Sequence, residues 1–239
     1  YQPIVNTQTD SITAREALMR WYSRELGWVS PTVFIPVAEQ SGLIERLSQF
    51  VLHRACRDAM RWPDGARVAV NISAAQLGQG TLGDMIATTL ESSGLPATRL
   101  EIEVTEAALV DDESRVMEEL YQLRATGVHI ALDDFGTGYS SLSHIHRFPF
   151  DKIKIDGSFV RDSTTRPDYA AMVRTIADIG HRLGVTTVAE GVETQAHLET
   201  IRAEGCQEMQ GYVYARPAPE PHDRDTVDRL NAQAAKPAA

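Results

Sequence analysis

Two adjacent aspartates, Asp133 and Asp134, follow an apolar segment and precede a glycine-rich turn in HIALDDFGTGYSSL, residues 129–142. Neighbouring carboxylates repel each other, so such a pair is either solvated or placed beside positive charge. Further oxygen-bearing side chains fall at or near the ends of other apolar segments, namely Glu16, Asn71, Glu103 and Glu190. Oxygen ligands suit hard divalent ions such as Mg²⁺ or Mn²⁺. The set is large enough for two ions sharing one aspartate, and two ions about 3.5–4 Å apart form a clamp for in-line phosphoryl displacement.

A lysine accompanies these acids. Lys154 lies between Ile153 and Ile155, so in a strand it points to the opposite face from both. One lysine cannot balance five carboxylates, and each buried charge costs several kcal/mol before mutual repulsion is counted. The acids are therefore expected to take up protons or to bind cations.

Each of these features also has a structural interpretation. A single acid at a strand end is often solvated or caps a helix, and EGVET fits a helix start with Thr194 as the N-cap. FGTG resembles a phosphate-binding loop but lacks the spacing of better-known ones. Lys154 alone could be an ion-pair partner within the fold. The functional interpretation depends on several strands placing such groups in the same phase.

Short apolar segments alternate with longer amphipathic ones along the chain. Eight segments are predicted as strands, at residues 2–5, 11–18, 66–73, 100–106, 129–135, 151–156, 186–191 and 210–215. Helical segments separate most of them, and repeated strand–helix units imply a parallel sheet. Eight such strands predict an α/β fold, a modified (β/α)8 TIM-type barrel whose strand ends share one rim, where active sites are built. An open doubly wound sheet is the alternative.

The first connection departs from this pattern. Only NTQTD, residues 6–10, joins the first two strands, and a parallel crossover needs about a dozen residues or more. The first strand is therefore predicted to run antiparallel to the second. A capped helix is predicted over SPTVFIPVAEQSG, between Ser30 and Gly42. Further helices are predicted where apolar residues repeat at helical spacing: Leu47, Val51, Ala55 and Ala59; Leu82, Ile86 and Leu90; Val116, Leu120 and Leu123; Met172, Ile176 and Ile179.

Composition bounds the function. The chain has 239 residues, 43% of them hydrophobic, which suits one domain with a sizeable core. A formal net charge of −10 argues against binding long nucleic acid, because phosphate binding requires basic surface. No apolar run reaches the about 18 residues that suggest a membrane span, so no membrane contact by this domain is expected. Cys56 and Cys206 lack the spacing of a zinc site or a disulfide framework, which suits a reducing cytoplasm.

The ends of the chain suggest a piece of a longer protein. The sequence opens in mid-pattern with YQPIVN and without a signal peptide. We expect one domain over residues 1–232 and a flexible C-terminal tail over residues 233–239.

Several motifs occur in a fixed order along nearly the whole chain. They are REALMRW, FIPVAEQSGLI, VNISAAQ, EIEVTE, DDFGTGYSSL, KIKIDGSFV, VAEGVET and EGCQEMQGY. The tripeptide Glu16-Ala17-Leu18 alone means little, but the ordered set resembles the EAL domain family of bacterial cyclic di-GMP phosphodiesterases. The family fold is a barrel whose first strand is antiparallel, in agreement with the short first connection.

The resemblance implies roles for individual residues. The first metal ion would be held by Glu16, Asn71, Glu103 and Asp133, and the second by Asp133, Asp134 and Glu190. Lys154 matches the lysine that holds the attacking water, and Glu190 matches a residue also assigned as general base. Glu106 matches a residue that steadies the DDFGTG loop, which in the family couples the site to dimerisation. The remaining matches are supporting site residues, Glu193 and Gln210, and positions that contact the dinucleotide, Gln2, Leu18 and Arg20.

The resemblance therefore implies a metal-dependent phosphodiesterase that hydrolyses cyclic di-GMP to linear pGpG in bacterial second-messenger signalling. It also implies a cytoplasmic homodimer with N-terminal regulatory domains, in a parent protein that is free or anchored in a membrane. Two alternatives are a cyclic di-GMP receptor without turnover and a barrel hydrolase for another phosphate ester. Two positions depart from the family pattern: Ala14 replaces a usual glycine, and Gly157 replaces a common arginine. Neither removes a metal ligand, so Gly157 bears on regulation more than on chemistry.

Overall fold

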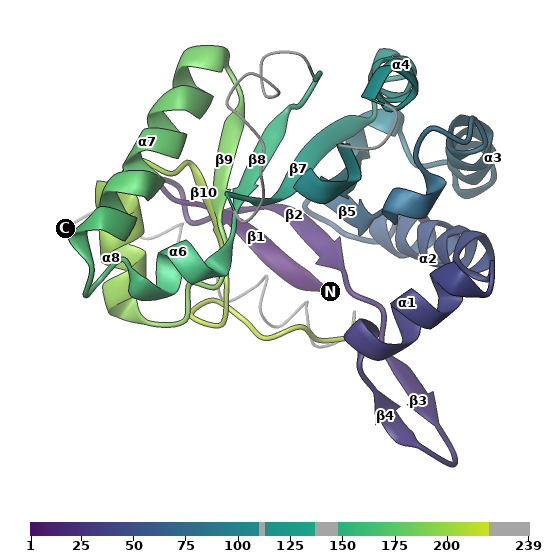
Figure 1. Ribbon diagram of the computed structural model, residues 1–239, viewed down its shortest axis with the longest axis horizontal. Helices are drawn as coiled ribbons and strands as arrows, with labels where there is room; N and C mark the ends of the chain where they lie inside the picture. Colours follow the sequence, from purple (N-terminus) through teal and green to yellow (C-terminus); the bar gives the residue numbers. More distant parts are fainter. Residues whose placement is uncertain (110–112, 137–147, 220–239) are drawn as a thin grey trace.

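The computed structural model describes residues 1–109, 113–136 and 148–219. Eight strands close into a barrel, and helices surround it (Figure 1). The barrel strands are β1 (Gln2–Asn6), β2 (Ile12–Ala17), β5 (Arg67–Asn71), β6 (Leu100–Thr105), β7 (His129–Phe135), β8 (Lys152–Ile155), β9 (Thr186–Ala189) and β10 (Glu208–Gln210). The closed sheet confirms the predicted barrel and excludes the open doubly wound sheet.

Strand β1 runs against both of its neighbours. It pairs antiparallel with β2 and with β10, whereas the other neighbouring strands of the barrel pair in parallel. The connection to β2 is a tight turn, in which Asn6 Oδ1 accepts the backbone N–H groups of Gln8 and Thr9 at 3.0 Å. The antiparallel first strand predicted from the short connection is thus confirmed.

Helices cover the outside of the barrel. They are α1 (Pro31–Gln40), α2 (Ile44–Ala59), α3 (Leu82–Ser93), α4 (Glu113–Ala125), α6 (Gly157–Asp162), α7 (Pro167–Leu183) and α8 (Gln195–Ala203), with 3-10 turns η1 (Ala74–Gln76), η2 (Ala97–Arg99) and η3 (Glu106–Leu109). Two predicted helix starts are present, because the Ser30 side chain accepts the N–H of Thr32 and Thr194 accepts that of His197. Within the described ranges, no helix has the length and apolar character needed to cross a bilayer.

The buried face of α7 differs from the prediction. It consists of Val173, Ile176, Ala177 and Gly180, whereas Met172 is exposed. A Cβ atom on Gly180 would lie 2.5 Å from Thr187 Cγ2, so the helix approaches β9 through small residues. A pattern of hydrophobic residues gives little weight to alanine and glycine. The predicted apolar face of α7 is therefore rotated relative to the face that packs on β9.

The last strand is shorter and earlier than predicted. β10 ends at Gln210 instead of beginning there, and the N–H groups of Tyr214 and Ala215 then bond to Gly211 O in a turn. The segment GYVY has strong strand propensity, but its backbone bonds go to this turn and to Val192.

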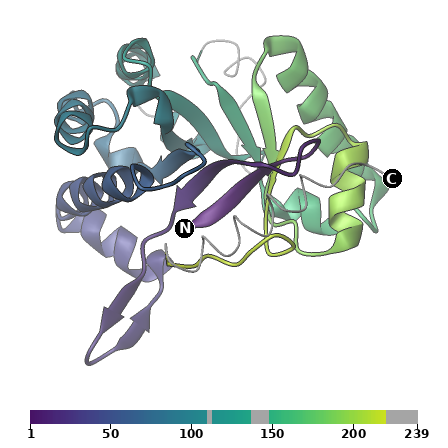
Figure 2. The same cartoon turned by 180° about the vertical axis from the view of Figure 1, so that it is seen from behind.

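A hairpin that the sequence analysis did not predict projects from the barrel (Figures 1 and 2). It is formed by β3 (Trp21–Ser23) and β4 (Gly27–Val29), which pair antiparallel. Tyr22 and Trp28 pack against each other with 60% and 73% of their surface exposed. Because both faces of the hairpin are largely solvated, it lacks the alternation that marks a half-buried strand.

The barrel interior contains a group of charges, which we call the Lys152 cluster: the buried Lys152, Glu101 and Glu208, and the half-buried Arg67. Lys152 Nζ lies 2.9 Å from a carboxylate oxygen of Glu101 and 2.9 Å from one of Glu208, and Arg67 Nε lies 3.6 Å from Glu101. Each of the three buried members lies two positions before a predicted site residue on the same strand: Lys152 before Lys154, Glu101 before Glu103 and Glu208 before Gln210. Each side chain therefore points to the same face of its strand as that site residue, one layer deeper in the barrel.

Ala14, one of the departures from the family pattern, is fully buried. It packs with Ile4 and Val188 in a small apolar cluster. It precedes Glu16 by two positions, so its methyl group lies on the same face of β2 as that acid. The larger residue is accommodated by packing and leaves the acid at the rim.

We expect Gly211→Ala to lower the free energy of unfolding by at least about 2 kcal/mol, measured by urea denaturation. A Cβ atom at Gly211 would lie 2.2 Å from Val192 O and 2.3 Å from Val192 N, and backbone atoms cannot move aside cheaply. The control is Gly83→Ala on α3, where a Cβ meets nothing within 4 Å. That variant should be neutral or more stable by up to about 1 kcal/mol; equal losses in both would contradict the steric argument.

Candidate functional site

The predicted site residues lie together at one end of the barrel. Glu16, Asn71, Glu103, Asp133, Lys154 and Gln210 lie at or near the carboxyl ends of six different strands, and Glu190 follows a seventh. A cavity of about 310 Å³ opens among them. Of the predicted residues it is lined by Gln2, Glu16, Leu18, Asp133, Lys154, Glu190, Glu193 and Gln210. Gln2 joins this rim because β1 is antiparallel and pairs Gln2 with Glu16.

Lys154 lies at the centre of the group of acids, which we call the Lys154 cluster: Lys154, Glu16, Glu103, Asp133 and Glu190. Its Nζ atom lies 2.8 Å from Glu190 Oε1, 3.0 Å from Glu103 Oε2, 3.1 Å from Asp133 Oδ1 and 3.7 Å from Glu16 Oε2. Lys154 is 1% exposed and Glu103 is fully buried. One ammonium thus faces four carboxylates in a space that excludes most water.

Glu16 is fixed by neutral amides as well as by Lys154. Asn71 Nδ2 donates to Glu16 Oε1 at 2.7 Å, and Gln210 Nε2 donates to Glu16 Oε2 at 2.6 Å. Gln210 Nε2 also lies 3.2 Å from Gln2 Oε1, which connects the start of β1 to the site. Burial raises the pKa of Glu16, but Lys154 and these two amides outweigh burial and leave the pKa lowered.

The other acids do not receive enough positive charge. Burial raises the pKa of Glu103 well above its usual range, and Lys154 offsets only part of this effect. Burial also raises the pKa of Glu190, to about 8. Burial lowers the pKa of Lys154, but the surrounding carboxylates, led by Glu103, raise it well above its usual value. The lysine therefore stays charged, and the acids need further positive charge if all of them are to ionise together.

Asp134 has an unusual backbone conformation. Its φ angle is +54°, in the left-handed region that aspartate tolerates better than most residues, and its N–H donates to Asp133 Oδ1 at 3.0 Å. Burial and the neighbouring Asp133 raise its pKa. One oxygen each of Asp133, Asp134 and Glu190 lie within 4.8 Å of one another. This arrangement of hard oxygen donors fits a divalent cation.

Glu106 holds the turn that follows these aspartates. It is 3% exposed, and its Oε2 accepts the backbone N–H of Gly136 at 2.9 Å. Gly136 itself has φ of +98°, so the turn begins with a residue suited to that conformation. The remainder of the DDFGTG loop, from residue 137, lies outside the described residues.

Arg20 is the predicted site residue that the structure places apart. Its side chain is exposed, and Nη1 donates to Met19 O at 2.9 Å. It lines a neighbouring cavity of about 790 Å³, and Leu18 lines both that cavity and the one around Lys154. A ligand that reaches Arg20 must therefore extend across Leu18.

Tyr212 is a lining residue that the sequence analysis missed. It lies on the Lys154 cavity, is 44% exposed, and has the Arg216 guanidinium 4.2 Å from its ring centre. The segment QGYVYA was interpreted as a strand, so Tyr212 was not considered as part of the mouth. Its position two residues after Gln210, an assigned site residue, was the available signal.

The chain is similar to known proteins over most of its length. Residues 1–217 match the family model described as the EAL domain. The bifunctional diguanylate cyclase/cyclic di-GMP phosphodiesterase MucR and the cyclic di-GMP phosphodiesterase NbdA, both of Pseudomonas aeruginosa, are each 40% identical to the chain over 223 residues. These alignments cover 92% of this chain, 33% of MucR and 28% of NbdA. The chain spans about a quarter to a third of the length of the curated relatives it matches.

Solved structures agree in fold. The PaMucR phosphodiesterase in complex with c-di-GMP superposes with a TM-score of 0.88 at 39% identity, and the match covers 93% of this chain and 92% of that one. A family model that matches well over half of the chain, together with relatives of this similarity, confirms the resemblance seen in the motifs: the chain belongs to the EAL domain family.

Proposed function

We propose that this domain is a metal-dependent phosphodiesterase that hydrolyses one phosphodiester bond of cyclic di-GMP to give linear pGpG. The Lys154 cluster carries this proposal, because four carboxylates lie within 3.7 Å of one ammonium at the mouth of the barrel. MucR and NbdA are named as cyclic di-GMP phosphodiesterases, and the PaMucR structure contains c-di-GMP.

The donor set fits two Mg²⁺ or Mn²⁺ ions. One ion would be held by Glu16, Asn71, Glu103 and Asp133, and the other by Asp133, Asp134 and Glu190. Supporting this, all of these donors are oxygens, and burial raises the pKa of several of the acids, which a nearby dication would reverse. When bound, the ions would supply charge to neutralise the phosphoryl oxygens and to acidify a water molecule.

We assign Lys154 and Glu190 to the attacking water molecule. Because its pKa is raised, Lys154 is a hydrogen-bond donor that orients the water oxygen and not a base. Glu190 lies 2.8 Å from Lys154 Nζ and is the only member of the cluster that follows its strand instead of lying within it. We assign it either proton removal or metal ligation, and Glu106 the indirect role of holding the turn after Asp134.

The substrate would lie across the cavity mouth. Gln2, Glu193 and Gln210 offer hydrogen-bonding groups, Leu18 an apolar surface, and Arg20 a planar guanidinium for a phosphate or a guanine.

We expect Tyr212→Ala to raise KM for cyclic di-GMP about fivefold to a hundredfold with a smaller change in kcat. The exposed ring can stack on a guanine, and stacking contributes about 1–3 kcal/mol per base. Steady-state kinetics would measure it, with Tyr212→Phe as the control that keeps the ring. A fall in kcat at constant KM would instead assign Tyr212 to the chemical step.

Product formation tests the central proposal. With Mg²⁺, the purified domain should convert cyclic di-GMP to linear product, seen by chromatography, and EDTA or Glu16→Ala should abolish the conversion. Glu16 is 7% exposed and holds both neighbouring amides, so folding of the variant is checked by circular dichroism. Ligand that stays intact with Mg²⁺ or Mn²⁺ present would favour the receptor alternative. Turnover of mononucleotide esters at similar rates would favour a less selective phosphate-ester hydrolase.

The wider assembly is also a proposal. We infer a homodimer and N-terminal regulatory domains in the parent protein, working in the cytoplasm. The further domains are supported by MucR, the relative with a second activity in its name, which is about three times as long as the matched region.

A further inference from the structure

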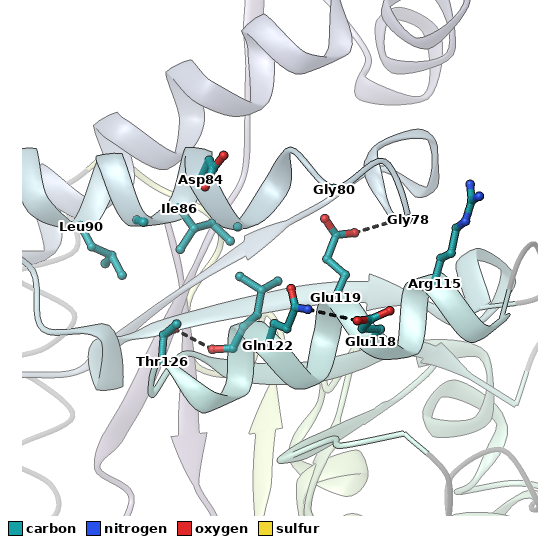
Figure 3. A pocket seen from close by; sticks show the side chains of 13 residues that line it. Gly78, Gly80, Asp84, Ile86, Leu90, Arg115, Glu118, Glu119, Gln122 and Thr126 are labelled. Carbon is teal, nitrogen blue, oxygen red and sulfur yellow. Dashed lines mark hydrogen bonds between the residues drawn. The ribbon is translucent and has the colours of Figure 1, made fainter.

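A second cavity lies between α3 and α4, on the outer wall of the barrel (Figure 3). Its volume is about 470 Å³, within the range of small-molecule sites. It shares no lining residue with the cavity around Lys154. Its apolar walls include Ile86 and Leu90 from α3 and Leu123 from α4.

Glu119 is the buried polar side chain of this cavity. It is 7% exposed, and Figure 3 shows its carboxylate rising from α4 toward the loop that bears Gly78. Oε2 accepts the Gly78 N–H at 2.7 Å. The other oxygen, Oε1, is buried and accepts no hydrogen bond from any residue that the structure describes. A buried carboxylate oxygen without a donor costs about 1–3 kcal/mol or more, so this atom calls for a partner.

The charge around Glu119 determines what that partner is. Three carboxylates line the cavity, on Asp84, Glu118 and Glu119, against one guanidinium, on Arg115. This balance disfavours an anion. Asp84 and Glu118 are exposed, so Glu119 Oε1 is the only buried carboxylate oxygen without a hydrogen-bond donor among the described lining residues, too few for a bare divalent ion that needs about six ligands. A single directional acceptor beside apolar walls instead suits an N–H donor on an apolar body.

We propose that the α3–α4 cavity binds a small organic cation. Its ammonium or amidinium group donates to Glu119 Oε1, and its hydrocarbon part packs on Ile86, Leu90 and Leu123. Gly78 and Gly80, both with positive φ, line the cavity without adding side chains to it. The site is separate from the phosphodiesterase chemistry and does not depend on it.

Calorimetric titration with 2-phenylethylammonium, and with neutral 2-phenylethanol of similar shape, tests this site on the whole chain. The ammonium should bind saturably to one site and more tightly than the alcohol. Glu119→Gln should weaken ammonium binding about tenfold or more, because it removes the charge but keeps an acceptor for the Gly78 N–H. The matched control is Glu118→Gln on the same helix, whose exposed carboxylate bonds to Gln122 at 3.4 Å. It should change the affinity less than about threefold.

A second variant tests the site independently, in case Glu119→Gln does not fold. Ala87→Leu keeps a strong helix former on the α3 wall and places a larger side chain at the cavity while leaving Glu119 in place, so it should also abolish binding. The proposal is overturned if the ammonium does not bind saturably, if the alcohol binds equally well, or if Glu119→Gln and Glu118→Gln behave alike. A crystal structure grown with the ammonium that shows only water at Oε1 overturns it too.

Discussion

Asp133→Asn should lower kcat/KM for cyclic di-GMP by on the order of a thousandfold. Asp133 Oδ1 lies 3.1 Å from Lys154 Nζ and accepts the Asp134 N–H at 3.0 Å. Asparagine has nearly the same shape and can keep the second of these contacts, but it removes the charge on the residue proposed to bridge both cations. Because the fold is preserved, the loss should appear in the rate of linear product formation at saturating Mg²⁺ and not in stability.

Gly157→Arg is the comparison variant for Asp133→Asn. A Cβ atom at Gly157 would lie 3.5 Å from Gly191 Cα and 3.6 Å from Glu190 O, which is ordinary van der Waals contact. The Cβ atom of an arginine, the residue common in the family, therefore fits at this position without a clash, and kcat/KM should stay within about threefold of the wild-type value. Comparable losses in the two variants would contradict the role given to Asp133.

Lys152→Met should lower the free energy of unfolding by about 3–5 kcal/mol, the largest stability effect we expect. Lys152 is 2% exposed, and its removal leaves the carboxylates of Glu101 and Glu208 buried without the ammonium that lies 2.9 Å from each. Burial lowers the pKa of Lys152, but these two acids outweigh burial and raise it. A raised pKa means that the lysine stabilises the fold fully at neutral pH and loses this effect only as the pH rises through the raised value.

Urea denaturation at pH 7 measures this loss, and two further variants define it. Adding Glu208→Gln to Lys152→Met should recover part of the stability, because one uncompensated charge is removed. Arg166→Met breaks an ion pair with Asp168 in which the two side chains are 52% and 61% exposed, and it should leave the free energy of unfolding almost unchanged. If Lys152→Met cost no more than Arg166→Met, the Lys152 cluster would have no stabilising role.

Strand phase made the barrel and much of the site predictable. A polar residue between two apolar ones, such as Lys154 between Ile153 and Ile155, must face the other side of its strand. In a closed parallel barrel those faces converge, and Lys154 does meet Glu103 and Asp133 at about 3 Å. The short link after the first strand likewise left only the antiparallel arrangement open, because no crossover fits in it.

Depth and loop conformation were not predictable in the same way. Lys152 and Glu101 have the same phase as Lys154 and Glu103, yet they form a separate cluster, because alternation gives the face of a strand and not the layer. Tyr212 lies in a turn whose path depends on the close contact of Gly211 with Val192, which no local pattern reports. Arg20 follows a strand by three residues, and its exposed position depends on where the hairpin after it projects.

The reversed direction of β1 places the start of this strand at the mouth of the barrel. In an all-parallel barrel the first strand would start at the opposite end from the site, and its five residues would separate the two. Here Gln2 pairs with Glu16 at the mouth, and the Tyr1 amino group donates to Ala218 O beside it. A domain joined ahead of Tyr1 would therefore attach at this entrance, where Gln2 accepts a hydrogen bond from Gln210, and would reach the site without passing through the barrel.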